Sequence, residues 1–247
     1  HQVEAVEFTM DAFAKGHGCC LALSMGMGKT LSTLAILDVI GARVPGAYML
    51  IITPAVITLN WEREYDKWQP PNVMFQGAIL KMSSVAERLL KNTQKTGGII
   101  VTTVDTFRLH LHLFGNPTIM IIDEGHRIKN PRTQLFAAVD TIETPYKLAL
   151  TGTPLQNNLQ ECFTLMNWIS PGLLGSWKQF QNCFGSDIEN ESNYAKSQGR
   201  VHMLKQKLDT VVFRRDNLAS ILPKKREFRV ALLVPTITFE SSNLLPM

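Results

Sequence analysis

The sequence predicts an α/β fold, with a parallel sheet flanked by helices and a C-terminal helical protrusion. From Cys19 to Ile169, short runs rich in Ile, Val and Leu alternate with amphipathic stretches of helical length, as in successive βαβ units. Several apolar runs end in polar residues, at the sheet edge where such folds bind ligands. After Ser170-Pro171-Gly172 the pattern changes, and residues 176–220 have a helical character interrupted by a polar stretch at 186–198.

The expected elements follow this alternation in order. Strands are expected at Cys19–Ser24, Tyr48–Thr53, Gly98–Thr103, Ile119–Asp123 and Lys147–Thr151, with a sixth candidate at Val73–Leu80. Helices are expected at Thr30–Ile40, Val56–Trp68, Ser84–Asn92, Asp105–Leu113, Thr133–Thr141 and Leu159–Ile169. Residues 228–239 return to a β-like alternation.

The composition fits a folded intracellular protein. Hydrophobic residues make up 45% and charged residues 19% of the 247, which excludes a disordered chain. No apolar run approaches the ~20 residues that span a bilayer, and the first residues lack a signal-peptide pattern. The net charge of +4 arises after residue 170, where phosphate contact and an ordinary solvated surface explain it equally well.

The cysteines and the His110-x-His112 pair do not have metal-ligand spacing. The four cysteines, Cys19, Cys20, Cys162 and Cys183, are expected to be buried, reduced thiols. Residues two apart point to different faces of a helix, so a surface or packing role is expected for the two histidines.

A phosphate-binding loop is predicted at Met25-Gly26-Met27-Gly28-Lys29-Thr30, between a strand and a helix. The two glycines would let backbone amides approach phosphate, Lys29 would reach the β and γ phosphates, and Thr30 would offer its hydroxyl to Mg²⁺. The strict pattern has glycine where this chain has Leu23. A glycine-rich turn with an unrelated lysine is the structural alternative.

Two adjacent carboxylates, Asp123 and Glu124, follow the apolar run Ile119–Ile122. In a magnesium-nucleotide site the first acid would hold the metal and the second would polarise the attacking water. Alternatively, Asp123 caps the next turn and Glu124 pairs with Arg127.

These residues resemble the Swi/Snf family of superfamily-two ATPases over nearly the whole chain. The resembling segments are His1-Gln2 (glutamine motif), Met25–Thr30 (motif I), Ile51–Pro54 with Trp61 and Trp68 (motif Ia and its helix), Val101–Thr103 (motif Ib), Asp123–Asn130 (motif II) and Leu150–Asn158 (motif III). Gly125, Leu174-Gly175-Ser176 and Arg214-Arg215-Asp216 are most similar to the ATRX-like and Rad-like subgroup.

The resemblance implies a RecA-like lobe that binds ATP and Mg²⁺, with roles for particular residues. Gln2 would contact adenine together with motif I, and Lys29, Asp123 and Glu124 would be catalytic. DNA-backbone contacts would come from Thr53, Pro54, Thr102 and Thr103, and coupling to the nucleotide state from His126, Thr151, Gly152, Thr153, Gln156 and Asn157. Short polar residues suit sequence-tolerant, salt-sensitive phosphate contact.

The resemblance also implies domains and partners. Residues 1–170 would form the first ATP-binding lobe, and 171–247 the helical protrusion and the start of the inter-lobe linker, with Leu222–Lys225 closing the protrusion. The expected partners are double-stranded DNA, a second RecA-like lobe and chromatin proteins, in the nucleus and with no membrane.

Two departures from the family pattern bear on activity. Leu23-Ser24 stands where family members usually carry an acidic pair, although the ATRX-like subgroup also varies there. The family's second lobe, with its arginine fingers, is not among these 247 residues. Such an arginine contributes ~10³–10⁵ in phosphoryl-transfer rate, so this chain alone is expected to bind ATP and hydrolyse it weakly.

Three hypotheses follow. The first is the ATP-binding lobe of a DNA-dependent ATPase that moves along duplex DNA. The second is a truncated, non-catalytic DNA- or protein-binding module. The third, an RNA helicase, is disfavoured by the Gln156-Asn157-Asn158 extension and the protrusion.

Overall fold

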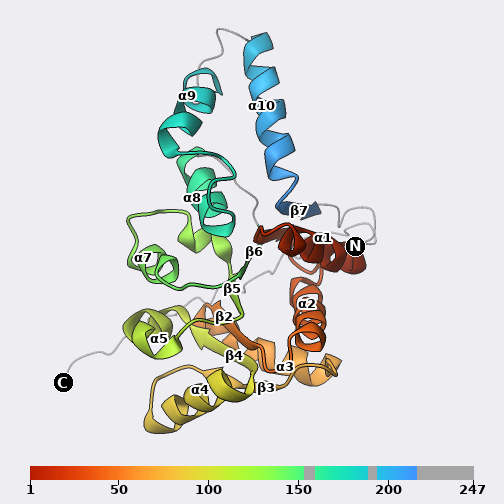
Figure 1. The fold of residues 1–247 in the computed structure, drawn as a ribbon, viewed down its shortest axis with the longest axis vertical. Coiled ribbons are helices and arrows are strands. Elements are labelled where there is room, and N and C mark those ends of the chain that lie inside the picture. Colours follow the sequence, from red (N-terminus) through yellow and green to blue (C-terminus); the bar gives the residue numbers. More distant parts are fainter. Residues whose placement is uncertain (153–158, 189–193, 216–247) are drawn as a thin grey trace, which may run out of the picture. The chain divides into compact units, whose positions relative to one another are not determined.

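Seven strands form one sheet in the computed structural model, in the order β3-β4-β2-β5-β6-β1-β7 (Figure 1). The structure describes residues 1–152, 159–188 and 194–215. Every neighbouring pair of strands is parallel. The strands are β1 (Cys19–Leu23), β2 (Tyr48–Thr53), β3 (Phe75–Ile79), β4 (Gly98–Thr103), β5 (Ile119–Asp123), β6 (Tyr146–Thr151) and β7 (Val212–Arg215).

Helices cover both faces of the sheet. Helices α1, α2 and α3 lie on one face, and α4, α5, α7 and α8 lie on the other (Figure 1). Every residue of β1, β2, β4 and β5 is buried, as expected for parallel strands with layers on both sides. The helices are α1 (Gln2–Ala14), α2 (Lys29–Arg43), η1 (Ala55–Ile57), α3 (Thr58–Trp68), α4 (Ser84–Thr96), α5 (Val104–Leu109), α6 (Leu111–Phe114), η2 (Gly125–Ile128), α7 (Gln134–Asp140), α8 (Leu159–Ile169), α9 (Trp177–Ile188) and α10 (Tyr194–Leu208).

The predicted α/β fold with a parallel sheet is confirmed, and so are the predicted strands, to within two residues at their ends. The helix expected at Val56–Trp68 begins with the short η1 turn, and the one expected at Asp105–Leu113 is divided at His110. The N-terminal helix α1 was not among the predicted elements. The β-like stretch at 228–239 lies outside the described residues.

Strand β7 corrects the prediction that residues 176–220 are helical on both sides of the polar stretch at 186–198. Helices α9 and α10 lie there, but the chain then returns to the sheet and pairs β7 with β1, placing Leu21 opposite Phe213. Phe213 is buried and its ring lies 5.6 Å from that of Phe8 on α1. Along the chain, helices α9 and α10 therefore lie between β6 and β7, which belong to the same sheet.

The thiol prediction is confirmed for three cysteines and wrong for one. Cys19, Cys20 and Cys162 are buried, whereas Cys183 is exposed. Cys183 lies on α9, whose buried side chains Phe180 and Phe184 face the core. Only one side of α9 packs against the core, so Cys183, which lies on the other side, faces solvent.

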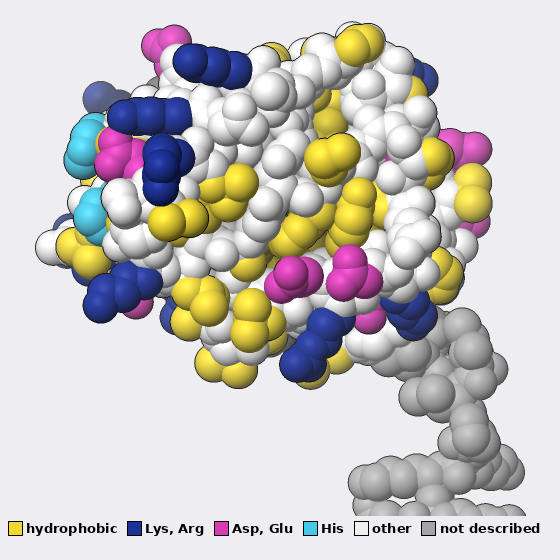
Figure 2. Space-filling model, turned by 90° about the horizontal axis from the view of Figure 1, so that it is seen from below, with side chains coloured by type: hydrophobic (Ala, Val, Ile, Leu, Met, Phe, Trp, Pro, Cys, Tyr) yellow, Lys and Arg dark blue, Asp and Glu magenta, His cyan; other side chains and the backbone are white. Residues whose placement is uncertain are grey.

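The face of the protein shown in Figure 2 carries both hydrophobic and charged side chains. In Figure 2, hydrophobic side chains occupy the middle of the face, and most Lys and Arg side chains lie toward its margins. The described Lys and Arg side chains on this face therefore do not form one continuous basic surface. Within the described ranges, no helix combines the length and apolar character needed to cross a membrane.

Candidate functional site

The register of the sheet brings four strand ends to one edge. Thr53 at the end of β2 aligns with Thr103 at the end of β4. Asp123, which ends β5, aligns with Leu150 of β6, and Thr151 aligns with Ala22 of β1. Because all these strands are parallel, the residues that follow them share the carboxyl edge of the sheet, where ligands bind in open α/β folds.

The loop from β1 to α2 has the geometry of a phosphate cradle. Gly26 and Gly28 have φ values of 80° and 75°, in the left-handed region that glycine adopts without strain. A Cβ atom at Gly26 would meet only open space, and Gly28 precedes α2 without a side-chain cap. The N–H groups of a helix N-terminus attract anions, so this loop fits a nucleotide phosphate.

The glutamine-motif residues lie against this loop. A Cβ atom at Gly28 would sit 2.7 Å from Gln2 Nε2, and His1 Nε2 lies 3.1 Å from the carbonyl oxygen of Met27. The start of α1 and the loop therefore form one wall, although these segments are separated by more than twenty residues.

Lys29 lies between the ends of β1 and β6. Its Nζ donates a hydrogen bond of 3.0 Å to the carbonyl oxygen of Leu23. The position of a Cβ atom on Gly152 would be 3.4 Å from the same Nζ. Burial raises the pKa of the Asp123 carboxyl, and the nearby positive charge of Lys29 weakly opposes that rise. The lysine and the acid predicted to share a site therefore lie at the same edge of the sheet.

Asp123 is an almost fully buried carboxylate, with 7% of its surface exposed. Its Oδ2 accepts hydrogen bonds from Trp61 Nε1 at 3.0 Å and Thr53 Oγ1 at 3.4 Å, and its Oδ1 accepts from the backbone N–H of Glu124 at 3.0 Å. Burial raises the pKa of Asp123, and the hydrogen bond from Trp61 opposes that rise. A buried acid whose pKa is shifted by desolvation and by charged neighbours is a candidate functional residue.

Glu124 adopts an uncommon backbone conformation for its residue type. Its φ is 57°, in the left-handed region, which costs a non-glycine residue of order 1–3 kcal/mol. Its carboxylate lies 3.2 Å from His126 Nδ1. In the described contacts Glu124 therefore has His126 as its partner, not the Arg127 considered from the sequence.

A pocket of about 440 Å³ adjoins the phosphate loop. One wall is made by Gln2 and the loop with the start of α2, and the other by one face of α3. The α3 residues, which sequence reasoning missed apart from Trp68, are Asn60, Glu64, Lys67 and Trp68. Their spacing of four, three and one residues places them on one helical face, and this pattern could have identified them. Within this wall, Trp68 Nε1 donates to Glu64 at 2.9 Å, and Lys67 Nζ lies 4.8 Å from the Trp68 ring centroid.

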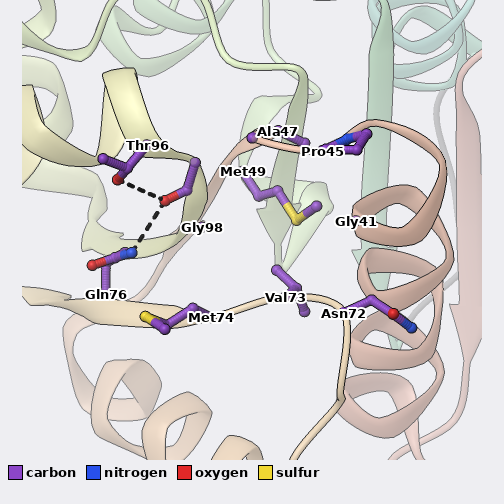
Figure 3. A pocket seen from close by; sticks show the side chains of 12 residues that line it. Gly41, Pro45, Ala47, Met49, Asn72, Val73, Met74, Gln76, Thr96 and Gly98 are labelled. Atoms are coloured by element: carbon purple, nitrogen blue, oxygen red, sulfur yellow. Dashed lines mark hydrogen bonds between the residues drawn. The ribbon is translucent and has the colours of Figure 1, made fainter.

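A second cavity, of about 400 Å³, opens at the opposite edge of the sheet (Figure 3). It lies where β2, β3 and β4 begin, and the side chains of Gln76 and Thr96 both donate to the carbonyl oxygen of Gly97 there. Its lining consists of Gly41, Pro45, Gly46, Ala47, Met49, Asn72, Val73, Met74, Gln76, Thr96, Gly97 and Gly98. None of these side chains is charged, so the first pocket is the one whose chemistry suits a triphosphate.

The threonines predicted to contact DNA use their hydroxyls within the protein. Besides the Thr53 bond to Asp123, Thr102 Oγ1 donates to the carbonyl of Ile79 at 2.9 Å. Thr103 Oγ1 caps α5 by accepting from the N–H of Thr106. All three threonines are buried, whereas Pro54 is half-buried.

Six residues were predicted to couple the site to the nucleotide state, and three of them lie at this edge. Thr151 is buried, Gly152 adjoins Lys29, and His126 contacts Glu124. Thr153, Gln156 and Asn157 lie outside the described residues.

An ion pair not foreseen from the sequence connects the segment after β5 to α8. Lys129 Nζ lies 2.7 Å from Glu161 Oε2.

The residues fit a magnesium ion held jointly by protein and nucleotide. In the parts of the chain that the structure describes, no cluster of three or more His, Cys, Asp or Glu side chains could hold a metal ion. Thr30 lines the pocket, and Asp123, which is outside that lining, ends β5 at the same edge of the sheet; each offers an oxygen ligand. Mg²⁺ is commonly bound through one or two protein groups, substrate phosphates and water rather than by an all-protein cage.

The parallel sheet, the glycine-rich loop that opens α2 and the paired acids that end β5 define a RecA-like P-loop nucleotide-binding lobe. The chain belongs to the SNF2-related domain family, whose family model matches residues 1–234.

Individual relatives agree with this assignment. The chain is 31% identical over 274 residues to the Transcriptional regulator ATRX homolog of Drosophila melanogaster, covering 93% of this chain and 21% of the relative. It is 29% identical to the DNA repair and recombination protein RAD54-like of Gallus gallus, with 92% and 35% covered. The Sulfolobus solfataricus SWI2/SNF2 ATPase core solved in complex with dsDNA matches with a TM-score of 0.75 and 30% identity, over 90% of this chain and 45% of that one. The chain therefore spans only a part of each.

Proposed function

We propose that this chain is the ATP-binding lobe of a DNA-dependent ATPase that translocates on double-stranded DNA, of the chromatin-remodelling or recombination-repair type. The observation that carries the proposal is that Lys29 and Asp123 lie at one carboxyl edge of the sheet, beside a helix N-terminus without a side-chain cap. Membership of the SNF2-related family supports it, as does the likeness to an ATPase core solved with dsDNA.

In the proposed site, motif I cradles the phosphates. The amides of residues 25–28 surround the phosphates, the Lys29 ammonium neutralises the β and γ oxygens, and Gln2 contacts the adenine. The pocket beside the loop, lined by Gln2 and Trp68, gives the base a place adjacent to this cradle.

Thr30 and Asp123 would hold Mg²⁺, and Glu124 would orient and polarise the attacking water. When bound, the ion supplies charge neutralisation at the β and γ phosphates. The left-handed backbone of Glu124 and its contact with His126 support this role, because both constrain where its carboxylate can lie.

DNA would be contacted at the turns after β2 and β4. Since the hydroxyls of Thr53, Thr102 and Thr103 are used internally, we propose that backbone N–H groups of these turns bind phosphates, while Pro54, which has no N–H, makes van der Waals contact with the DNA backbone. Such contacts carry no sequence information and weaken with salt. Thr151, Gly152 and His126, with Thr153, Gln156 and Asn157, would report the nucleotide state to this surface.

The parent protein would supply the remaining parts. Hydrolysis at a useful rate would need the second RecA-like lobe, and residues 171–247 would provide the protrusion and the start of the linker toward it. Chromatin proteins are proposed as partners, and the nucleus as the location, because the chain is similar to proteins such as the Transcriptional regulator ATRX homolog.

Replacing Lys29 tests the nucleotide site. Lys29→Ala should abolish ATP binding measured by isothermal titration calorimetry, because the phosphates lose their only proposed side-chain cation. Lys67→Ala, which removes a cation from the rim of the same pocket, is the matched control and should weaken binding less. Equal affinity of wild type and Lys29→Ala would remove Lys29 from its role.

The alternative is a non-enzymatic DNA- or protein-binding module, and measuring phosphate release from the two-lobed parent separates the two. The ATPase proposal predicts release that duplex DNA stimulates and duplex RNA does not. Nucleotide binding without stimulated release would favour the passive module, and stimulation by RNA would favour a helicase acting on RNA.

A further inference from the structure

Trp61 connects helix α3 to the acid that ends β5. Its side chain is buried, with 2% exposed, and its indole N–H donates to Asp123 Oδ2 at 3.0 Å. A buried tryptophan needs an acceptor for this group. Here the acceptor is neither a backbone carbonyl nor water but one oxygen of the carboxylate proposed to hold Mg²⁺.

The acceptor capacity of Asp123 is largely used by the protein. A carboxylate offers about four acceptor positions. Trp61 Nε1 and Thr53 Oγ1 occupy Oδ2, and the N–H of Glu124 occupies one position of Oδ1. Three donors from three places in the chain therefore fix the plane of this group, and within the described contacts only Oδ1 keeps a free position.

Without such donors the carboxylate would rotate. The terminal torsion of an aspartate has broad preferences, and a metal ligand that must first be oriented binds more weakly. Partners that orient metal ligands from outside the coordination shell typically contribute 10- to 100-fold in metal affinity.

We propose that Trp61, assisted by Thr53, is a positioning residue that holds the Asp123 carboxylate in the orientation in which it binds Mg²⁺ with the nucleotide. This inference rests on the proposed function of the site. It gives Trp61 and Thr53 a role distinct from packing of motif Ia or contact with DNA.

Binding of a non-hydrolysable ATP analogue, measured by calorimetry with and without Mg²⁺, tests the inference. In wild type, Mg²⁺ should increase affinity. Trp61→Phe, which keeps an aromatic ring but removes the N–H, should reduce that Mg²⁺-dependent gain by roughly 10- to 100-fold and leave the Mg²⁺-free affinity unchanged. Thr53→Val, which keeps the shape and removes the longer bond, should reduce the gain less.

Tyr65→Phe is the matched control on the same helix. It removes one hydroxyl that donates to the carbonyl of Val73 at 2.9 Å, away from Asp123. It should keep the full Mg²⁺-dependent gain.

The outcomes separate the inference from the proposed function. No analogue binding, or no Mg²⁺-dependent gain, in wild type would contradict the proposed function itself. A full gain in Trp61→Phe, or an equal loss of affinity with and without Mg²⁺, would overturn the positioning role alone.

A measurement on the unaltered chain guards against a variant that does not fold. In protein labelled with ¹⁵N-tryptophan, the Trp61 indole resonance should shift when Mg²⁺ is added to the analogue-bound chain. The resonance of Trp168, whose N–H donates to the carbonyl of Val139, should not shift. If both resonances stay unmoved while Mg²⁺ strengthens analogue binding, the inference fails.

Discussion

Lys29 is anchored by the backbone of the strand that precedes its loop. The bond from its Nζ goes to the carbonyl oxygen of Leu23, a group that any amino acid supplies. The departure of Leu23-Ser24 from the acidic pair usual in the family therefore changes side chains without removing this anchor. Nucleotide binding through Lys29 is expected to tolerate substitution at position 23 by another apolar residue.

Thiol reactivity should separate Cys183 from the other three cysteines. Burial raises the pKa of Cys19 and of Cys162 to about 12 and raises that of Cys20 as well, so at pH 8 these thiols are protonated and covered. With Ellman's reagent we expect one rapid reaction in the native chain and four in urea. Cys183→Ser should abolish the rapid phase, and a second rapid thiol in native protein would contradict this arrangement.

The same thiols make stability depend on pH in the alkaline range. Their pKa values are higher in the folded than in the unfolded chain, so the folded chain retains protons that the unfolded chain loses. Their contribution to the unfolding free energy is therefore complete below the unfolded pKa of about 8.5 and decreases as the pH rises above it.

Individual site residues were predictable to different degrees. The loop glycines, Lys29 and the acid pair form short sequence patterns whose chemistry is local, so their convergence could be predicted. The bond from Trp61 to Asp123 joins residues 62 apart, and no local periodicity specifies which acceptor a buried indole will meet. The left-handed conformation of Glu124 likewise follows from its surroundings, because its residue type disfavours that conformation.

At the scale of elements, helix α2 packs closely on the segment before β3. A Cβ atom at Gly41 would lie 2.3 Å from the carbonyl oxygen of Asn72. That segment is fixed to α2, since Asp38 accepts two hydrogen bonds from Asn72. Because the added Cβ atom would meet backbone and not a flexible side chain, the two segments could relieve the clash only by moving apart.

Gly41→Ala should therefore destabilise the chain although alanine favours helices. We expect a loss of about 1–3 kcal/mol from overpacking, measured by urea unfolding. Gly199→Ala on α10, where a Cβ atom would meet nothing within 4 Å, is the control and should gain about 0.5–1 kcal/mol. Similar changes in both variants would mean that helix propensity, and not the contact, governs position 41.

The predictability of elements depended on length and pattern. Strands β1, β2, β4 and β5 are mostly apolar, fully buried runs of five or six residues, which sequence patterns detect. Strand β7 has four residues and ends in two exposed arginines, so its sequence lacks a buried-strand pattern and its place is set by pairing with β1. The buried residues of helix α1 are Ala5, Thr9, Ala12 and Phe13. Two of these are small and one is polar, so the buried face of α1 differs little in hydrophobicity from the exposed face and its sequence pattern is weak.

At the scale of the molecule, a nucleotide that binds only the folded chain must stabilise it. The site draws on α1, the β1–α2 loop, α3 and β5, so unfolding of the chain destroys it. At a concentration of one hundred times its Kd, ATP analogue with Mg²⁺ should add about 2.7 kcal/mol to the unfolding free energy. Urea titrations measure this, and Lys29→Ala should show no increment. An equal increment in that variant would place the bound nucleotide elsewhere.

The alternation of strands and helices was enough to predict a parallel sheet, but not the order of its strands. The order β3-β4-β2-β5-β6-β1-β7 follows from which strands bury their edges against one another, and that is decided by contacts between distant segments. The edge at which the site would form could still be predicted, because in a parallel sheet every strand presents its carboxyl end on the same side.

The pairing of β7 with β1 has a consequence for how the protein is made. Synthesis begins at the N-terminus, so β1 leaves the ribosome almost two hundred residues before its outer neighbour at Val212–Arg215. Throughout that interval its backbone donors and acceptors on that side are open to any other extended polypeptide. We therefore expect that a chain whose synthesis stops within α9 or α10 exposes this unpaired edge and self-associates.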